Sequence, residues 1–208
     1  MNDRPGGNAS DSEAGSDGKS DAAVSGGSVD PAMLARLIRK PGPAPVHLWD
    51  PPYCGEMDLR ITRDGSWIHE GRPIRRAALV RLFASVLKKE GERFFLVTPV
   101  EKVGIQVEDC PFVATGVDIA DPGPEQKLIF SLNTGDQAVV DEAHPLSVSQ
   151  VAGSDEPHPI VHVRDGLNAL LTRSVFYQVV AAGETCSEGG VTRLEIRSCG
   201  DVFELGQL

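Results

Sequence analysis

The feature that most constrains the fold is a series of short segments with β-branched or alternating apolar residues. These segments are separated by Pro, Gly, Asp and Asn, and they lie at 94–98, 103–107, 112–119, 127–132 and 137–140. Short segments of this kind between turn-forming residues are typical of β-strands. The sequence therefore predicts a meander of strands through the middle of the chain.

The most specific local signal is the pair Asp64-Gly65, which separates strand-like residues at 59–63 and 66–69. An Asp-Gly pair in this position favours a tight β-hairpin turn, because glycine adopts positive φ without steric cost. We therefore predict a hairpin around it. The preceding segment, 49–58, is rich in turn formers, and we expect a loop held by aromatic residues.

Three segments have the pattern of amphipathic helices. Apolar residues recur at helical spacing over 75–89, and Gly91 follows as a stop signal. A second helix is expected from about 172 to 182. A third is expected after Asp30, which would be its N-cap, with Pro31 at the first helical position.

The tripeptide Arg-Asp-Gly occurs at 63–65 and again at 164–166, each time followed by an apolar segment, an arginine and a helix. This order indicates a diverged internal duplication, closed by strands at 191–197 and 202–205. We expect an α+β fold of two tandem related units of mainly antiparallel strands, each with one helix. The expected parts are a tail at 1–28, an N-terminal α+β unit with its leading helix at 29–110, and a C-terminal barrel-like unit at 111–208.

The first 28 residues are mostly Gly, Ser and Asp and include no aromatic residue, so burial cannot offset the entropy of ordering them. We predict a disordered acidic tail. The net charge of −10 repels nucleic-acid polymers and anionic membrane surfaces. No apolar run approaches the ~20 residues that span a bilayer, and no secretory signal opens the chain. We expect a soluble cytoplasmic protein of undetermined oligomeric state.

Four cysteines, Cys54, Cys110, Cys186 and Cys199, lie far apart and form no CxxC pair. In a cytoplasm they are expected to be thiols. The carboxylates near Cys54 disfavour its thiolate, so we expect a small hydrophobic residue there and not a nucleophile. The chain also contains no phosphate-binding loop, dinucleotide-binding glycine motif, nucleophile elbow or HExxH sequence. We therefore predict no catalytic residues and no cofactor.

Histidines give only a weak metal signal. His158 and His162 point to the same face of a predicted strand, and His144 can join them together with Asp141 and Glu142 if the fold brings these residues close. Strand neighbours four residues apart are too distant for a tight pair. We therefore expect surface or capping histidines and no metal site.

Arginines near the two expected helices form the sharpest binding hypothesis. Arg75 and Arg173 each follow an Arg-Asp-Gly turn and precede a helix, where guanidinium groups and free amides favour an anion. The alternative is that these arginines pair with Asp64 and Asp165 and only fix the turns. Trp67 can stack on a ligand ring, although tryptophans in a chain with few aromatics are typical core residues. The candidate ligand-binding residues are Arg63, Asp64, Trp67, Arg75, Arg164, Asp165 and Arg173.

Several longer motifs resemble the proteobacterial domain-of-unknown-function 1285 family. They are WDPPYCGEMDLRI at 49–61, DGSW at 64–67, LVRLF at 79–83 and FLVTPVEK at 95–102. The similarity extends from about Leu34 to the C-terminus. It implies two related α+β units in tandem, the second similar to a pleckstrin-homology barrel, with a groove between them that holds a nucleotide-like ligand in signalling.

Three functions remain open from the sequence. The first is a non-enzymatic ligand-sensing or regulatory module that binds a small anionic, nucleotide-like molecule between its units. The second is a protein-interaction module that offers a strand edge or groove to a protein partner. The third is an enzyme of unfamiliar type, which would use carboxylates such as Asp58, Asp64 and Asp165 with His69 and would need a carboxyl pKa raised by burial.

Overall fold

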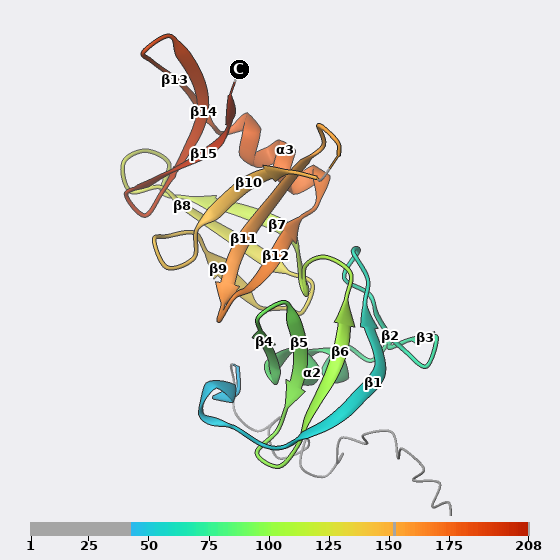
Figure 1. Ribbon diagram of the computed structural model, residues 1–208. Helices are drawn as coiled ribbons and strands as arrows, with labels where there is room; N and C mark the ends of the chain where they lie inside the picture. Colours follow the sequence, from blue (N-terminus) through green and yellow to red (C-terminus); the bar gives the residue numbers. More distant parts are fainter. Residues whose placement is uncertain (1–42, 152, 208) are drawn as a thin grey trace, which may run out of the picture.

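The computed structural model describes residues 43–151 and 153–207 of the 208-residue chain. Two six-stranded sheets follow one another along the molecule, and a three-stranded sheet lies beyond the second (Figure 1). This confirms the predicted α+β fold of two tandem related units. The expected tail and the expected helix after Asp30 lie outside the described residues. No helix in the described ranges is long and apolar enough to cross a membrane.

The first sheet has the strand order β3-β2-β1-β6-β5-β4 and carries helix α2. All pairs are antiparallel except β1 with β6, which run parallel. Its elements are η1 (Val46–Leu48), β1 (Tyr53–Ile61), β2 (Trp67–His69), β3 (Arg72–Pro73), α2 (Ala77–Ser85), β4 (Leu87–Glu90), β5 (Arg93–Val97) and β6 (Lys102–Val107).

The predicted hairpin around Asp64-Gly65 is confirmed, because β1 pairs with β2 in a register that places Ile61 opposite Trp67. The expected loop over 49–58 is wrong from Tyr53 onward, where β1 begins. Strand β6 supplies the hydrogen-bonding partner there, and Gly55, at a φ of 104°, lies where the register between the two strands shifts. The parallel partner comes from about fifty residues later in the chain, so local composition did not indicate this strand.

The predicted helix over 75–89 is shorter in the structure, where α2 covers only Ala77–Ser85. The residues after it form β4, which pairs with β5 and places Leu87 opposite Leu96. Val86 and Leu87 are fully buried, so their apolar character suits a strand as well as a helix. Pairing with β5 decides between the two, because the strand places Leu87 opposite Leu96 with both side chains buried.

The second sheet has the order β10-β11-β12-β7-β8-β9, and the third has the order β13-β14-β15. The strand segments predicted in this half and the helix near 172–182 are confirmed; the Thr172 side chain accepts a hydrogen bond from the Val175 amide and caps that helix. The elements are β7 (Phe112–Ala120), β8 (Lys127–Leu132), β9 (Gln137–Val139), β10 (Leu146–Gln150), β11 (Pro157–Arg164), β12 (Leu167–Leu171), α3 (Arg173–Ala181), β13 (Glu184–Glu188), β14 (Val191–Ser198) and β15 (Asp201–Gln207).

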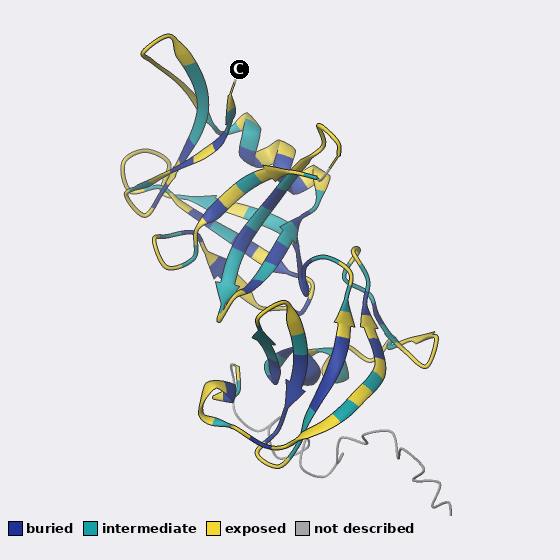
Figure 2. Cartoon of the chain, viewed as in Figure 1, coloured by how far each residue is buried: buried dark blue, intermediate teal, exposed yellow. Residues whose placement is uncertain are grey.

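Buried apolar residues of both units belong to one hydrophobic cluster, and Figure 2 shows buried residues on both six-stranded sheets. The cluster includes Leu59 and Val103 in the first sheet and Phe112, Phe130 and Leu167 in the second. The two Arg-Asp-Gly turns close antiparallel strand pairs in both units, and each precedes a helix of nine residues. The units are therefore joined through packed side chains as well as through the chain.

Candidate functional site

A groove lies where the β1–β2 turn of the first unit meets the second unit. Its volume is about 530 Å³. Arg63 and Asp64 reach it from the turn, while β7, β11, β12 and α3 supply its other walls. The lining residues are Arg63, Asp64, Val113, Glu156, Pro157, Pro159, Leu170, Leu171, Thr172, Arg173, Phe176 and Tyr177.

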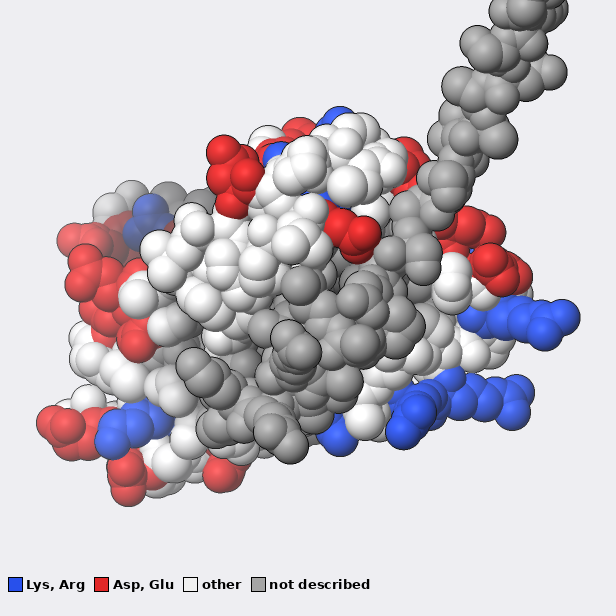
Figure 3. Space-filling view, turned by 90° about the horizontal axis from the view of Figure 1, so that it is seen from below, with Lys and Arg blue, Asp and Glu red and all other residues white. Residues whose placement is uncertain are grey.

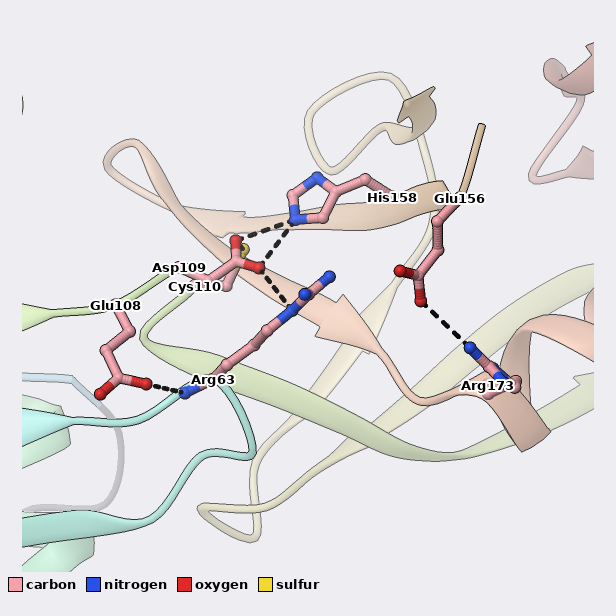
Figure 4. Close-up of polar contacts among 7 residues, drawn as sticks. All are labelled: Arg63, Glu108, Asp109, Cys110, Glu156, His158 and Arg173. Atoms are coloured by element: carbon pink, nitrogen blue, oxygen red, sulfur yellow. Dashed lines mark hydrogen bonds and ion pairs between the residues drawn. The ribbon is translucent and has the colours of Figure 1, made fainter. Parts of the chain in front are cut away.

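Arg63 is held at the boundary by two carboxylates of the segment that joins the units. Its backbone amide donates to Glu108 Oε2 at 3.0 Å, and its Nε lies 3.2 Å from Asp109 Oδ2 (Figure 4). The terminal guanidinium nitrogens extend past Asp109, and neither makes a hydrogen bond or ion pair within the described residues. Arg63 is thus fixed near its base, and its donor groups remain available.

Arg173 stands at the first position of α3, across the groove from the turn. Its Nη2 lies 3.1 Å from Glu156 Oε1 just before β11 (Figure 4). The Arg173 side chain is 73% exposed. An ion pair this open to water contributes only about 0 to 1 kcal/mol, so an incoming anion can compete with Glu156.

The groove combines these charges with apolar and aromatic surface. Pro157, Pro159 and Phe176 form part of its wall, and Tyr177, 62% exposed, presents a ring at the same place. The four charged lining side chains, two arginines and two acids, carry no net formal charge. The groove therefore suits a ligand with a flat apolar part and an anionic group better than a polyanion.

Two further contacts fasten the units beside the groove. The Asn133 side chain donates from Nδ2 to the Gly65 carbonyl at 3.1 Å and accepts from the Val113 amide at 3.1 Å. Gly65 has a φ of 82°, and a Cβ there would lie 2.5 Å from Asn133 Nδ2, so this approach requires glycine. Arg164 donates to the Ala84 carbonyl at 2.6 Å.

A second hollow, of about 330 Å³, also adjoins Arg63. Its other lining residues are Glu108, Asp109, Gln150, Val151 and His158. Here His158 Nε2 lies 2.8 Å from Asp109 Oδ1, and Cys110 Sγ lies 3.5 Å from the same oxygen. Burial, with the nearby Asp109 charge, raises the pKa of the Cys110 thiol to about 12. Without a bound cation, Cys110 is a neutral thiol.

Comparisons with known proteins agree with this two-unit arrangement. The family model described as Domain of unknown function (DUF1285), N-terminal domain, matches residues 44–110. The model described as Protein of unknown function (DUF1285), C-terminal domain, matches residues 111–205. The chain belongs to the DUF1285 family. The resemblance found in the sequence motifs is thereby confirmed.

Two solved structures of DUF1285 proteins are similar to this one. A DUF1285 family protein from Silicibacter pomeroyi is 50% identical, covers 84% of this chain and 93% of its own, and superimposes with a TM-score of 0.75. A second, from Shewanella baltica, is 27% identical over 61% of this chain and 92% of its own, with a TM-score of 0.48. A comparison with curated proteins gave no match.

The structure places the candidate ligand-binding residues of this DUF1285 protein in different locations. Arg63, Asp64 and Arg173 meet in the groove. Arg75 is exposed but does not line it. Trp67 is buried in the core, where its ring stacks on Phe83 with centroids 6.1 Å apart. Trp67 is thus a core residue in this structure.

The second Arg-Asp-Gly turn lies at the unit boundary without lining the groove. The Arg164 guanidinium lies over the Phe112 ring at 5.2 Å, and burial lowers its pKa. Asp165 adopts a φ of 47° in the turn itself. The two turns therefore differ in role, because only the first presents its side chains to the groove.

Arg75 belongs to a group of exposed arginines on β3, α2 and the segment between them. Its members are Arg72, Arg75, Arg76 and Arg81. In the view from below, most Lys and Arg atoms gather toward one side, while acidic side chains are spread along the rim (Figure 3). Arg75 is therefore an exposed arginine outside the groove, and it can serve as a control for substitutions of Arg63 and Arg173.

The enzyme hypothesis requires a carboxyl group whose pKa is raised by burial. Asp64, which does line the groove, shows the opposite: hydrogen bonds from the Thr62 side chain and the Ser66 amide hold its pKa below the ordinary value. Asp58 and His69 are not among the groove-lining residues. An ionised, exposed Asp64 can accept hydrogen bonds from a ligand but cannot donate a proton near neutral pH.

Proposed function

We propose that this DUF1285 protein is a non-enzymatic ligand-sensing or regulatory module that binds a small anionic, nucleotide-like molecule between its two units. The observation that supports it best is the groove of about 530 Å³, to which each unit contributes one arginine, Arg63 and Arg173. Pockets for small ligands commonly measure about 300 to 1,000 Å³ and combine apolar walls with a few polar groups.

The lining suggests how such a ligand would lie. A planar ring would stack on Tyr177 and the neighbouring prolines, since aromatic faces accept rings with little sequence preference. A phosphate or carboxylate would take the free nitrogens of Arg63 and replace Glu156 on Arg173. Asp64 would accept a hydrogen bond from a sugar hydroxyl or an amine.

Sensing follows from the position of the groove. A ligand that contacts both units binds most tightly to one relative orientation of the units and so increases the population of that orientation. The ligand can shift the balance between two orientations by no more than its difference in affinity for them. The groove thus has the position required for a signal carried by inter-unit geometry.

The test is native mass spectrometry of the purified protein, followed by a thermal-shift screen of nucleotides, dinucleotides and aromatic carboxylic acids. A ligand that prefers the folded protein raises its Tm. We expect Arg63→Ala and Arg173→Ala to weaken binding of a stabilising compound by about tenfold or more, as loss of a charge-assisted hydrogen bond implies.

Arg75→Ala is the matched control, because it removes an exposed arginine outside the groove. It should leave the Tm shift unchanged. Equal loss of binding in all three variants would indicate a general charge effect. No retained mass and no Tm shift across the screen would reject the proposal.

A protein-interaction module is the second candidate, favoured by strand β13. Among the described residues this strand pairs only with β14, and all five of its residues are exposed. An open edge of this kind can accept a strand from a partner. A photo-crosslinker attached at Cys186 on β13 should capture the same partner repeatedly, whereas one attached at the distant exposed Cys54 should not. Identical capture from both positions would reject a specific edge.

A further inference from the structure

The boundary between the units brings together three side chains that bind metals in other proteins. Asp109 and Cys110 lie in the segment between β6 and β7, and His158 lies on β11 of the second unit. One ligand atom from each, a carboxylate oxygen, Sγ and a ring nitrogen, falls within 4.8 Å of the others. Cys110 is buried, and Asp109 and His158 are 19% and 20% exposed.

We propose that Asp109 Oδ1, Cys110 Sγ and His158 Nε2 form a Zn²⁺ site that joins the inter-unit segment to strand β11. It goes beyond the proposed function, because it involves a different ligand bound by different residues. It also differs from the histidine group weighed in the sequence. In the structure His144 and His162 stack on each other, while His158 turns to Asp109.

The separations suit a tetrahedral ion after small adjustments. Bond lengths of about 2.0 to 2.3 Å place the ligand atoms of a zinc site about 3.3 to 3.6 Å apart. The Asp109 Oδ1 to Cys110 Sγ distance is already 3.5 Å, and the 2.8 Å from Oδ1 to His158 Nε2 has to open by about half an ångström. The third separation, from Cys110 Sγ to His158 Nε2, is no more than 4.8 Å, so side-chain rotation has only to adjust separations of this size.

The set of ligands selects the kind of cation. One thiolate, one imidazole and one carboxylate suit a borderline ion such as Zn²⁺, whereas Mg²⁺ and Ca²⁺ prefer oxygen ligands only. On binding, the Cys110 thiol releases its proton to solvent, and His158 presents the Nε2 lone pair with its proton on Nδ1. One thiolate and one carboxylate then neutralise the two positive charges, which lowers the cost of placing the ion in a half-buried site.

Arg63 completes the arrangement from outside the three ligands. Its Nε contacts Asp109 Oδ2, which also lies 3.0 Å from His158 Nε2, while Oδ1 lies close to both His158 and Cys110 and is the oxygen left for the ion (Figure 4). Partners of this kind orient a ligating carboxylate. The hollow of about 330 Å³ beside Asp109 and His158 leaves room for a water molecule as the fourth ligand.

The experiment uses the full chain without a polyhistidine tag, treated with a chelator and then titrated with Zn²⁺. Native mass spectrometry and calorimetry should give one tightly bound Zn²⁺ per chain, with a rise in Tm, and Mg²⁺ should give neither. Co²⁺ in place of Zn²⁺ should produce the absorption of a thiolate-bound, tetrahedral ion. That spectrum is a signature that an ion-pair network without metal cannot produce.

Variants then assign the ligands. Cys110→Ser, Asp109→Asn and His158→Gln should each weaken Zn²⁺ binding by about a hundredfold or more, since even loss of an outer partner costs 10- to 100-fold. Cys54→Ser, an exposed cysteine, and His162→Gln, on the same strand, are the matched controls and should bind as the unmodified chain does.

If Cys110→Ser fails to fold without metal, the Asp109 and His158 variants still decide, with circular dichroism as the check on folding. Absence of stoichiometric Zn²⁺, or binding that the three ligand variants retain, would overturn the site. A Zn²⁺ lost equally in the two control variants would show a surface ion and overturn it as well.

Discussion

Asn133→Ala should destabilise the protein measurably, because Asn133 forms two hydrogen bonds, one within the second unit to Val113 and one across the unit boundary to Gly65. The Val113 amide is in a buried residue, and without Asn133 Oδ1 it loses its partner, at a cost of about 1 to 3 kcal/mol. The Gly65 carbonyl is partly exposed, so water can replace Nδ2 and the cost there is about 0.5 kcal/mol. The free energy of unfolding should therefore fall by about 1.5 to 3.5 kcal/mol.

Urea unfolding gives this free energy directly, and a change of that size corresponds to a fall in Tm of roughly 3 to 14 °C for a chain of this length. Asn133→Asp separates the two bonds, because it keeps the acceptor for Val113 and loses the donor to Gly65. It should cost only about 0.5 kcal/mol. A loss below about 0.5 kcal/mol in Asn133→Ala would refute the predicted contribution of the two bonds, and an unchanged free energy of unfolding in Asn133→Asp would refute the claim that this side chain fastens the units.

Other predictions concern individual groups. In chelator-treated protein at neutral pH, Cys110 should react with iodoacetamide far more slowly than the exposed Cys54, because the pKa of Cys110 is raised to about 12. Peptide mass spectrometry measures the two rates, and equal rates would contradict this. Hydrogen bonding to Lys88 lowers the pKa of Glu90 from its ordinary 4.5, so the stability that Glu90 contributes is present above pH 4.5 and is lost as the pH falls below it. In urea unfolding between pH 3 and 5, Glu90→Gln should show a flatter dependence than the unmodified chain; an identical slope would contradict this. Arg164→Lys should lower the free energy of unfolding by roughly 1 to 3 kcal/mol, because lysine lacks the planar group that stacks and donates; no change would show that the contact is dispensable.

Most strands could be predicted from the sequence, because their apolar residues alternate between clear turn signals. The Asp64-Gly65 hairpin is the best example, since both the turn and its flanking pattern are local. Strand β13 could not be found in this way: it is exposed along its whole length and carries no apolar pattern. For the residues of β4 the sequence predicts a helix, because Val86 and Leu87 fit either period, and the pairing with β5 settles the choice.

The groove is partly predictable from the sequence, and the cluster of Asp109, Cys110 and His158 is not. Arg63 and Arg173 could be singled out because each lies beside an Arg-Asp-Gly turn or a helix start. His158 and Asp109 are 49 residues apart, and their contact depends on how the second sheet packs against the inter-unit segment. No spacing rule links a lone cysteine and aspartate to a histidine so far along the chain. Topology, not local pattern, brings these residues together.

The boundary between the units carries both the contacts that fasten the fold and the groups available for binding. Asn133 holds the β1–β2 turn, and the same turn presents Arg63 to the groove and to Asp109. A variant that loosens the turn therefore lowers stability and ligand affinity together. Removal of the Arg63 side chain keeps the backbone amide contact and should lower affinity more than it lowers stability. Comparing Asn133→Asp with Arg63→Ala separates the two effects, because the first moves the turn and the second leaves the backbone bond to Glu108 in place.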